Sequence, residues 1–354
     1  MRDYIQQGLD RDTALRIAGV SRHQYYHTPK SEKRGRKPTY TTERQHHWEP
    51  VVSVEEPEVA DEIRKIKSRP EGEDYGYRKV CVALMLMGYR INHKKVYRIM
   101  SAFQLLNDRH KRPQRTYVRY RKVTPTQPLE VIEMDIKYQW VERERRNAYI
   151  LTILDTFTRT VLYWGAGYQM KQEQIRQAWD QVIINYLQPA NLLSRKVHLE
   201  IRNDNGSQFA AQAVQTYFRD NHLRQVFTHP YTPQENGHIE SFHAILSRGL
   251  DKQRFFSLRD LEPWLNRFYK RYNQERLHSS IANLPPMLFW QLWDQGLIER
   301  REMAKGKVSF KLTVPYQQLS GKGSPRLASC KWRVALNGQS AIKMIRPESF
   351  QPSV

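Results

Sequence analysis

Helical patterning comes first along the chain, in two separate blocks. Residues 1–28 read as short helices, and Ser21 is the expected cap of the second of them. Residues 56–107 carry apolar stripes at helical spacing, with a break at Gly88 and a capping residue at Asn92. A helix, a glycine-containing turn and a polar helix are typical of a helix-turn-helix, although any pair of packed helices gives the same pattern.

The middle of the chain passes through strand-like and helical runs in turn. Three strands are followed by helix, strand, helix, strand and helix. The expected strands span residues 129–140, 148–154, 160–168, 197–202 and 224–228, and the expected helices span residues 171–187, 208–221 and 237–250. In the last helix, Ile239, Phe242, Leu246 and Leu250 recur at helical spacing and should bury one face.

The end of the chain changes from helical to strand patterning. Ser257 opens a capping-box pattern, so a helix should begin there, and residues 286–303 also read as helical. Beyond them, apolar residues alternate in runs, and the Asn337-Gly338 dipeptide is a strong hairpin signal. Residues 306–350 are therefore expected to form a β-rich domain, with either a DNA-binding or a purely structural role.

Net charge adds a class of partner to this pattern. The 354 residues include 58 Lys and Arg against 36 Asp and Glu, a net charge of +22. Such an excess favours nucleic acid as the partner, although a basic accessory protein has the same balance. Residues 29–55 and 108–127 are basic and read as linkers, the first as an arm along the minor groove and the second as a segment that follows the DNA backbone. The first of them reads equally well as a solvated charge run.

Cysteine content and apolar runs indicate the compartment. Cys81 and Cys330 are too few for a disulfide framework or a cysteine-rich zinc site. No run approaches about 18 apolar residues, and the N-terminus lacks the apolar segment of a signal peptide. We expect a cytoplasmic protein without a membrane partner.

Three acidic residues are the candidates for chemistry. Asp135 lies in an apolar run, Asp204 follows a short buried strand, and 35 residues separate Asp204 from Glu240. Carboxylates brought together repel one another unless hard cations hold them, and oxygen-rich sites suit Mg²⁺ or Mn²⁺. Two such ions can activate an attacking oxygen and stabilise the leaving oxygen of a phosphodiester.

The segments around these acids resemble the integrase-core transposases of bacterial insertion sequences, which are relatives of retroviral integrases. The similar blocks are Asp135 to Tyr138, Asn203 to Phe209 and Tyr231 to Phe242. The Asn-Gly-x-x-Glu-Ser-Phe segment, taken with the gap of 35 residues, is quite specific, whereas a lone Asp-Asn-Gly would not be. The resemblance covers residues 128–289, approximately.

The resemblance implies an RNase H-like catalytic core. In that core, Asp135, Asp204 and Glu240 are the catalytic residues and hold two Mg²⁺ ions, for which Mn²⁺ can substitute. The strand and helix order of the middle of the chain fits this fold. One position departs from the family: Ser247 stands where Lys or Arg is usual, with Arg248 next to it.

The expected fold class is therefore a multidomain α/β protein. Its parts would be a helix-turn-helix at 1–28, a basic linker at 29–55, a second helix-turn-helix at 56–107, a basic linker at 108–127, the RNase H-like integrase-type core at 128–255, a helical extension at 256–305 and a small C-terminal β-barrel at 306–350. The candidate DNA-binding residues are Arg22, His23, Gln24, Arg34, Arg36, Lys94, Lys95, Arg98, Lys111, Arg112, Arg115, Gln234, Asn236 and Arg248.

Other acids compete for the role of metal ligand. Glu133 shares the strand face of Asp135, Asp155 lies in a turn beside Arg159, and Glu235 lies in a loop. Each is more simply a surface or turn carboxylate, and none gives the gap of 35 residues.

The function implied by the resemblance is that of an insertion-sequence transposase. Such an enzyme binds the element ends, frees a 3′-OH and joins it to another strand. A catalytically silent DNA-binding regulator and a nuclease that never joins strands are the alternatives. The expected partners are double-stranded DNA at the element ends and target, further copies of the chain, and a protein made from an upstream reading frame. The expected location is the bacterial cytoplasm, in association with the nucleoid.

Overall fold

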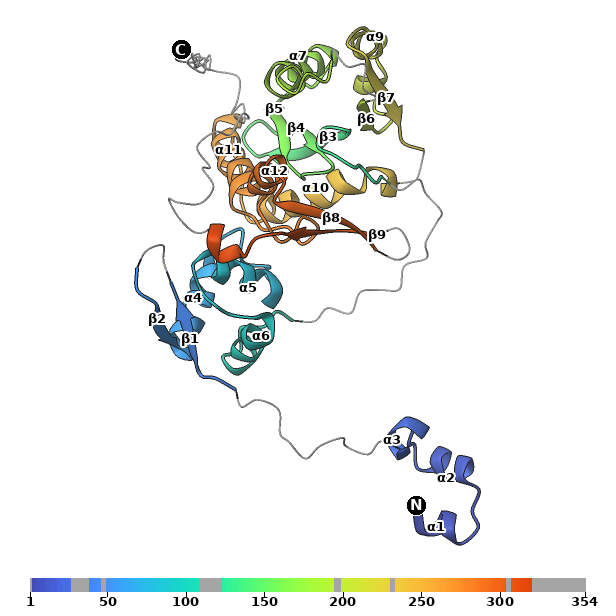
Figure 1. The fold of residues 1–354 in the computed structure, drawn as a ribbon. Helices are drawn as coiled ribbons and strands as arrows, with labels where there is room; N and C mark the ends of the chain where they lie inside the picture. The colour runs from blue at the N-terminus through green and yellow to red at the C-terminus, as the bar shows by residue number, and fades with distance from the viewer. Residues whose placement is uncertain are drawn as a thin grey trace, which may run out of the picture. The chain divides into compact units, whose positions relative to one another are not determined.

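The computed structural model describes residues 2–26, 38–45, 49–108, 123–193, 199–229, 233–303 and 307–319. The chain divides into two compact units, residues 1–40 and 41–354 (Figure 1). Among the described residues, no helix is long and apolar enough to cross a membrane.

The first unit contains the short helices that the sequence predicted. They are α1 (Arg2–Gln6), α2 (Arg11–Ile17) and α3 (Arg22–Tyr26). Ser21 caps α3 as expected, because its Oγ accepts the Gln24 N–H at 3.2 Å while Gln24 Oε1 accepts the Ser21 N–H at 3.0 Å.

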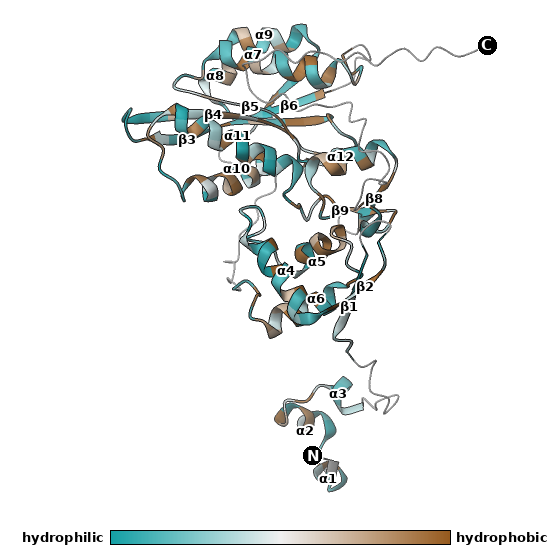
Figure 2. Ribbon diagram, turned by 90° about the vertical axis from the view of Figure 1, so that its left-hand side faces the viewer, coloured by the Kyte–Doolittle hydropathy of each residue, from teal (hydrophilic) through white to brown (hydrophobic). Residues whose placement is uncertain are grey.

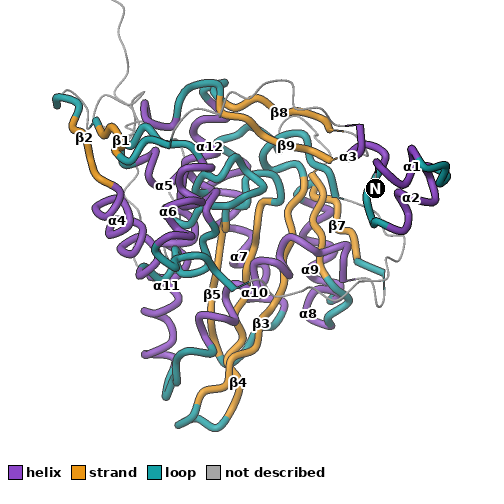
Figure 3. Tube along the Cα trace, turned by 90° about the horizontal axis from the view of Figure 1, so that it is seen from below, coloured by secondary structure: helices purple, strands orange, loops and turns teal. Residues whose placement is uncertain are grey.

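The second unit begins with a helical module. Its helices are α4 (Glu56–Ser68), α5 (Tyr77–Leu86) and α6 (His93–Ala102), and they enclose an apolar core (Figure 3). Asn92 caps α6 by accepting the Lys95 N–H at 2.9 Å, as predicted. Gly88 has φ of +87°, and a Cβ there would lie 2.2 Å from the Gln45 carbonyl oxygen, so the break at this position requires glycine.

The prediction of a linker over residues 29–55 is wrong for its C-terminal part. Strands β1 (Thr41–Arg44) and β2 (Val52–Glu55) pair in an antiparallel sheet that adjoins α4. Val54 on β2 is buried in the apolar core of the module. The basic composition concealed these strands, because each is short and only one side chain of β2 is buried.

The core of the second unit is a mixed five-stranded sheet. Its strands are β3 (Val131–Val141), β4 (Arg146–Asp155), β5 (Val161–Gly167), β6 (Leu199–Asn203) and β7 (Leu223–Phe227). The order across the sheet is β5-β4-β3-β6-β7, with β6 and β7 parallel to β3 and the other pairs antiparallel. This mixed sheet and its helices follow the strand and helix order that was expected for an RNase H-like core.

Helices cover both faces of this sheet (Figure 2). One face carries α7 (Gln172–Val182) with a π-helical turn at Ile183–Leu187, and α8 (Ser207–Ala210) and α9 (Gln212–Asp220). The other face carries α10 (Gly237–Leu250) and α11 (Leu258–Gln274). The apolar stripe predicted for α10 is confirmed, since Ile239, Phe242, Leu246 and Leu250 are all buried. The capping box predicted at Ser257 begins α11.

The predicted helix over residues 286–303 is too long. Helix α12 (Pro286–Asp294) ends before Gly296, where φ is +71° and the chain turns. Strand β8 (Ile298–Met303) follows and pairs with β9 (Lys307–Leu312), which is the first of the predicted C-terminal strands (Figure 3). A 3₁₀ turn spans Tyr316–Leu319. The β-barrel predicted at 306–350 is not confirmed, because its remaining strands, including the Asn337-Gly338 hairpin, lie outside the described residues.

Candidate active site

The strand register brings the first two candidate acids together. Strands β3 and β6 are parallel, with Glu133 opposite Arg202. Continuing this register by two residues sets Asp135 level with Asp204, the first residue beyond β6. Glu240 lies in the first turn of α10, which contacts β3. Sheet pairing and helix packing therefore direct the three acids towards one region, beside β3 and the C-terminal end of β6.

The electrostatics indicate that the three carboxylates lie near one another. Partial burial raises the pKa of Asp204, and the negative charge of Asp135 raises it further, although the Gly206 N–H bound to Asp204 Oδ1 lowers it. Burial also raises the pKa of Glu240, with further contributions from Asp135 and Glu133. Mutual repulsion of this kind is what a bound cation relieves.

Asp135 has a histidine neighbour on α10. The Asp135 Oδ2 and His243 Nδ1 atoms lie 3.3 Å apart, and Asp135 Oδ1 accepts the Ile136 N–H at 2.7 Å. His243 is one turn beyond Glu240 on the same helix. Its Nε2 is buried and has no hydrogen-bond partner among the described residues.

Glu133 is a structural carboxylate, and the expectation of a surface position is wrong. The residue is fully buried, and its Oε2 accepts the Ile239 N–H at 2.7 Å while Oε1 lies 2.8 Å from His238 Nδ1. A carboxylate is favourable at a helix N-terminus because the first N–H groups have no partner within the helix. Glu133 thus joins the strand that carries Asp135 to the helix that carries Glu240.

The other two competing acids are buried as well. Asp155 holds its turn, as the sequence suggested, but it is fully buried and accepts the N–H groups of Leu129 at 2.9 Å and Thr158 at 2.8 Å. Burial raises its pKa, and these hydrogen bonds oppose that rise. Glu235 accepts the His229 N–H at 3.1 Å and is also buried. The turn role expected for Asp155 is therefore found, whereas a surface position is wrong for Glu235.

The donor set suits hard divalent cations. Three carboxylates supply the oxygen ligands that Mg²⁺ and Mn²⁺ prefer. As the side chains stand in the described part of the chain, no group of three or more Asp, Glu, His or Cys is arranged to hold an ion. The chemistry of Asp135, Asp204 and Glu240 fits the metal that the resemblance implies.

The candidate DNA contacts of the first unit have intramolecular partners. Arg22 forms an ion pair with Asp12, and Gln24 is bonded to Ser21. His23 lies exposed on α3. Since α3 is only five residues long, its exposed side chains are few.

In the second module, the three candidates on α6 differ from one another. Lys94 is exposed. Lys95 donates from Nζ to the Thr41 carbonyl oxygen at 2.6 Å, and Arg98 forms an ion pair with Glu56. Lys95 and Arg98 therefore also tie α6 to β1 and to the start of α4.

Two core candidates have described side chains. Asn236 is buried, and its Oδ1 has no hydrogen-bond partner among the described residues. Arg248 is exposed at the end of α10 and forms an ion pair with Asp74 at 3.3 Å. The candidates that lie outside the described residues or side chains are Arg34, Arg36, Lys111, Arg112, Arg115 and Gln234.

Sequence reasoning did not assign roles to Glu133 and His238. A signal for Glu133 existed, because it lies in an apolar strand that was expected to be buried, where a charged residue needs hydrogen-bond donors. The identity of the donors could not be read, since Ile239 is 106 residues away.

Comparison with known proteins agrees with this architecture. Integrase core domain models match residues 125–233 and 221–286, and an HTH-like domain model matches residues 55–113. An uncharacterized 39.2 kDa protein of insertion element IS476 from Xanthomonas euvesicatoria is 25% identical over 283 residues, which cover 79% of this chain and 72% of that protein. The putative transposase InsK of insertion sequence element IS150 from Escherichia coli is 23% identical, covering 65% of this chain and 82% of the relative.

Solved structures with a similar arrangement were also found. An intasome of simian T-cell lymphotropic virus aligns with a TM-score of 0.40 and 17% identity, covering 65% of this chain and 73% of the other. The catalytic domain of the Mos1 mariner transposase aligns with a TM-score of 0.36 and 15% identity, covering 46% and 74%. The family models and the sequence relatives support an insertion-sequence transposase with an integrase-like core.

Proposed function

We propose that this transposase cuts DNA at the ends of its insertion sequence and joins the freed 3′-OH to a target strand, with Asp135, Asp204 and Glu240 as the metal-binding catalytic residues. The observation that supports this best is the parallel register of β3 and β6, which sets Asp135 level with Asp204 at the edge approached by α10. When bound, two Mg²⁺ ions would activate the attacking oxygen and stabilise the leaving oxygen.

The protein's own contribution is positioning. Asp135 lies on a central strand of the sheet, and the Gly206 N–H orients Asp204 at 3.0 Å. Glu240 follows the helix start that Glu133 holds. Catalytic groups fixed on a rigid scaffold avoid reorganisation during the reaction, so their placement lowers the barrier.

DNA recognition would fall to the helical module and to the first unit. The helical module matches an HTH-like domain model, both segments carry basic side chains, and the net charge of +22 favours a polyanion. One core engages one scissile phosphate while an element has two ends, so we expect a symmetric multimer on DNA. Association with an upstream-frame protein and with the nucleoid remains an expectation.

The test uses labelled element ends and a supercoiled plasmid in Mg²⁺ or Mn²⁺. Asp135→Asn, Asp204→Asn and Glu240→Gln should each abolish cleavage and joining while DNA binding persists, because each removes a metal ligand and leaves the DNA-binding modules intact. Asp220→Asn, an exposed acid at the end of α9, is the control and should join DNA normally. Cutting without joining by the unaltered protein would indicate a nuclease, and binding alone would indicate a regulator.

A further inference from the structure

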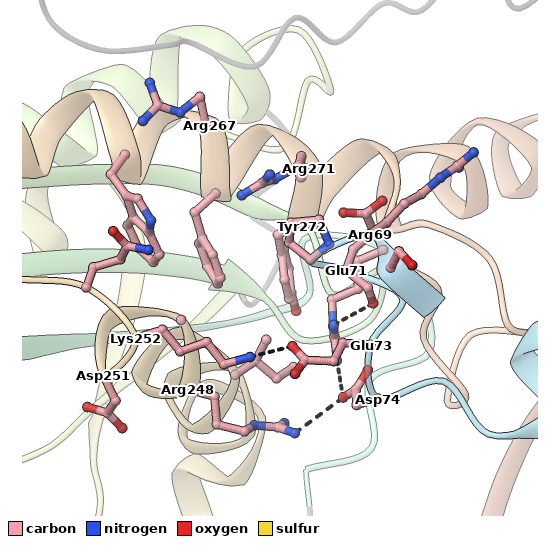
Figure 4. Close-up of a pocket in the computed structure, with 18 of the residues that line it drawn as sticks. Arg69, Glu71, Glu73, Asp74, Arg248, Asp251, Lys252, Arg267, Arg271 and Tyr272 are labelled. Carbon is pink, nitrogen blue, oxygen red and sulfur yellow. Dashed lines mark hydrogen bonds and ion pairs between the residues drawn. The ribbon is translucent and has the colours of Figure 1, made fainter. Parts of the chain in front are cut away.

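A groove lies where the loop between α4 and α5 meets α10 and α11 (Figure 4). Its volume is about 1170 Å³. Seven basic and four acidic side chains line it, so its net charge is positive. Neither the catalytic acids nor the recognition residues assigned to α3 and α6 line this groove.

The charges in the groove are segregated by element. The acids Glu71, Glu73 and Asp74 belong to the loop, whereas most of the cations belong to α10, α11 and the residues after them. Asp74 forms ion pairs with Arg248 at 3.3 Å and with Arg276 at 2.6 Å. The cations on α10, α11 and the residues after them, namely Arg248, Lys252, Arg267, Arg271 and Arg276, form a basic wall. The loop places carboxylates against this wall, in positions that phosphate oxygens could also take.

Two cations of the basic wall are not engaged by the carboxylates of the loop. Arg267 and Arg271 lie one turn apart on α11 and line the groove. Within the described ranges, neither guanidinium has an ion pair or a side-chain hydrogen bond. Arg267 is exposed and Arg271 is half-buried, so both can reach a ligand in the groove.

Aromatic rings form the adjoining surface. Trp264 and Phe268 on α11 line the groove, are partly exposed, and stack with their ring centroids 5.3 Å apart. A basic wall that tracks phosphates, beside aromatic faces on which bases stack, is the combination that binds single-stranded nucleic acid.

One carboxylate of the loop is held weakly. The Glu73–Lys252 ion pair is exposed on both sides, with side-chain exposures of 63% and 58%. Exposed pairs contribute little to stability, so a phosphate can replace Glu73 beside Lys252 at little cost. The Asp74–Arg276 pair is different, because the Arg276 side chain is only 8% exposed and also donates to the Glu71 carbonyl oxygen at 2.9 Å.

We propose that this groove binds a single DNA strand, with its phosphates on Arg267, Arg271 and Lys252, its bases against Trp264 and Phe268, and Glu73 as an intramolecular competitor. The identity of the polyanion as DNA rests on the proposed function. The site would hold an unpaired strand near α10 while the catalytic acids act at the other end of that helix.

The test measures binding of a fluorescent oligo-dT strand and of a random duplex to the full chain by anisotropy, across salt concentrations and without divalent metal. Arg267→Gln with Arg271→Gln should weaken oligo-dT binding about tenfold and reduce the log–log salt slope by about 1.4, from two lost phosphate contacts on a single strand. Arg259→Gln with Lys270→Gln is the matched control, because it removes two exposed cations of α11 outside the groove. Melting temperatures confirm that both pairs fold.

A substitution in the loop between α4 and α5 should strengthen binding of the single strand. Glu73→Gln should tighten oligo-dT binding about two- to fivefold, since it releases Lys252 from a surface ion pair. Equal weakening by the two double variants, or no gain from Glu73→Gln, would overturn the proposal. A loss confined to the duplex would overturn the assignment to a single strand. Joining activity is not part of this readout, so absence of joining in the unaltered protein would refute the proposed function without deciding the groove.

Discussion

The six acids near the active site form two groups with opposite surroundings. Asp135, Asp204 and Glu240 are half-buried or exposed, and Asp204 and Glu240 feel the charge of Asp135. The second group is Glu133, Asp155 and Glu235, each buried and each bound by backbone N–H groups. Asp135 and Asp204 each accept one backbone N–H as well, so the two groups differ chiefly in burial. This difference separates structural carboxylates from ligand-binding ones without reference to any relative.

Removal of a buried carboxylate should have the largest effect on stability. Asp155→Asn replaces an acceptor oxygen by an NH₂ group that faces donors from Leu129 and Thr158, which leaves buried groups unpaired. We expect a loss of about 3 kcal/mol in the free energy of unfolding, measured by denaturant titration. Asp204→Asn should change it by less than about 1 kcal/mol in the absence of metal. Equal losses would remove the distinction between the two groups.

Glu133 belongs to the buried group but supports a member of the other group, because it binds the start of the helix that carries Glu240. Its replacement should therefore affect catalysis more than DNA binding. Glu133→Gln keeps the shape but weakens the link between β3 and the start of α10, so Glu240 is held less firmly. Strand joining should fall about 10- to 100-fold at saturating metal, as for other groups that orient metal ligands, while DNA affinity stays unchanged. Glu144→Gln, in the exposed turn after β3, is the control. An unchanged joining rate would mean that the helix start does not need this carboxylate.

Addition of metal should change the free energy of unfolding by the smallest amount, and this change should differ between variants of the two groups of acids. Mg²⁺ at ten times its dissociation constant should stabilise the unaltered protein by about 1.4 kcal/mol, because the ion binds the folded state alone. Asp135→Asn should lose this gain, whereas Asp155→Asn should keep it despite its lower stability. Thermal melting with and without Mg²⁺ measures both. A gain that persists in Asp135→Asn would place the metal elsewhere.

Elements with a strong local period could be predicted from the sequence. The five strands of the sheet and the buried face of α10 were correctly anticipated, because alternation and helical spacing are visible in a short window. The catalytic acids were chosen from a resemblance, and the structure adds that the β3–β6 register aligns two of them.

Features that depend on distant partners could not be predicted. Strand β8 read as helix because its pairing partner β9 lies further along the chain, and β1 read as linker because its stability comes from β2 and the helical module. The buried acids were misplaced for the same reason. Their donors come from other elements, such as Leu129 for Asp155, and burial of a charge depends on such partners.

The junction between the helical module and the core has an evolutionary consequence. Leu277, three residues beyond the end of α11, is buried in the apolar core of the module, and its N–H donates to the Tyr75 hydroxyl oxygen at 2.7 Å. Its neighbour Arg276 is also buried and forms an ion pair with Asp74 of the module, so two adjacent residues that follow the core are bound to the module. If recombination exchanged the module between related elements, Arg276 could lose its ion pair with Asp74. Leu277 could lose the apolar residues of the module that bury it. We therefore expect the module and the segment after α11 to be inherited together, and substitutions at positions 74 and 75 to be correlated with substitutions at positions 276 and 277.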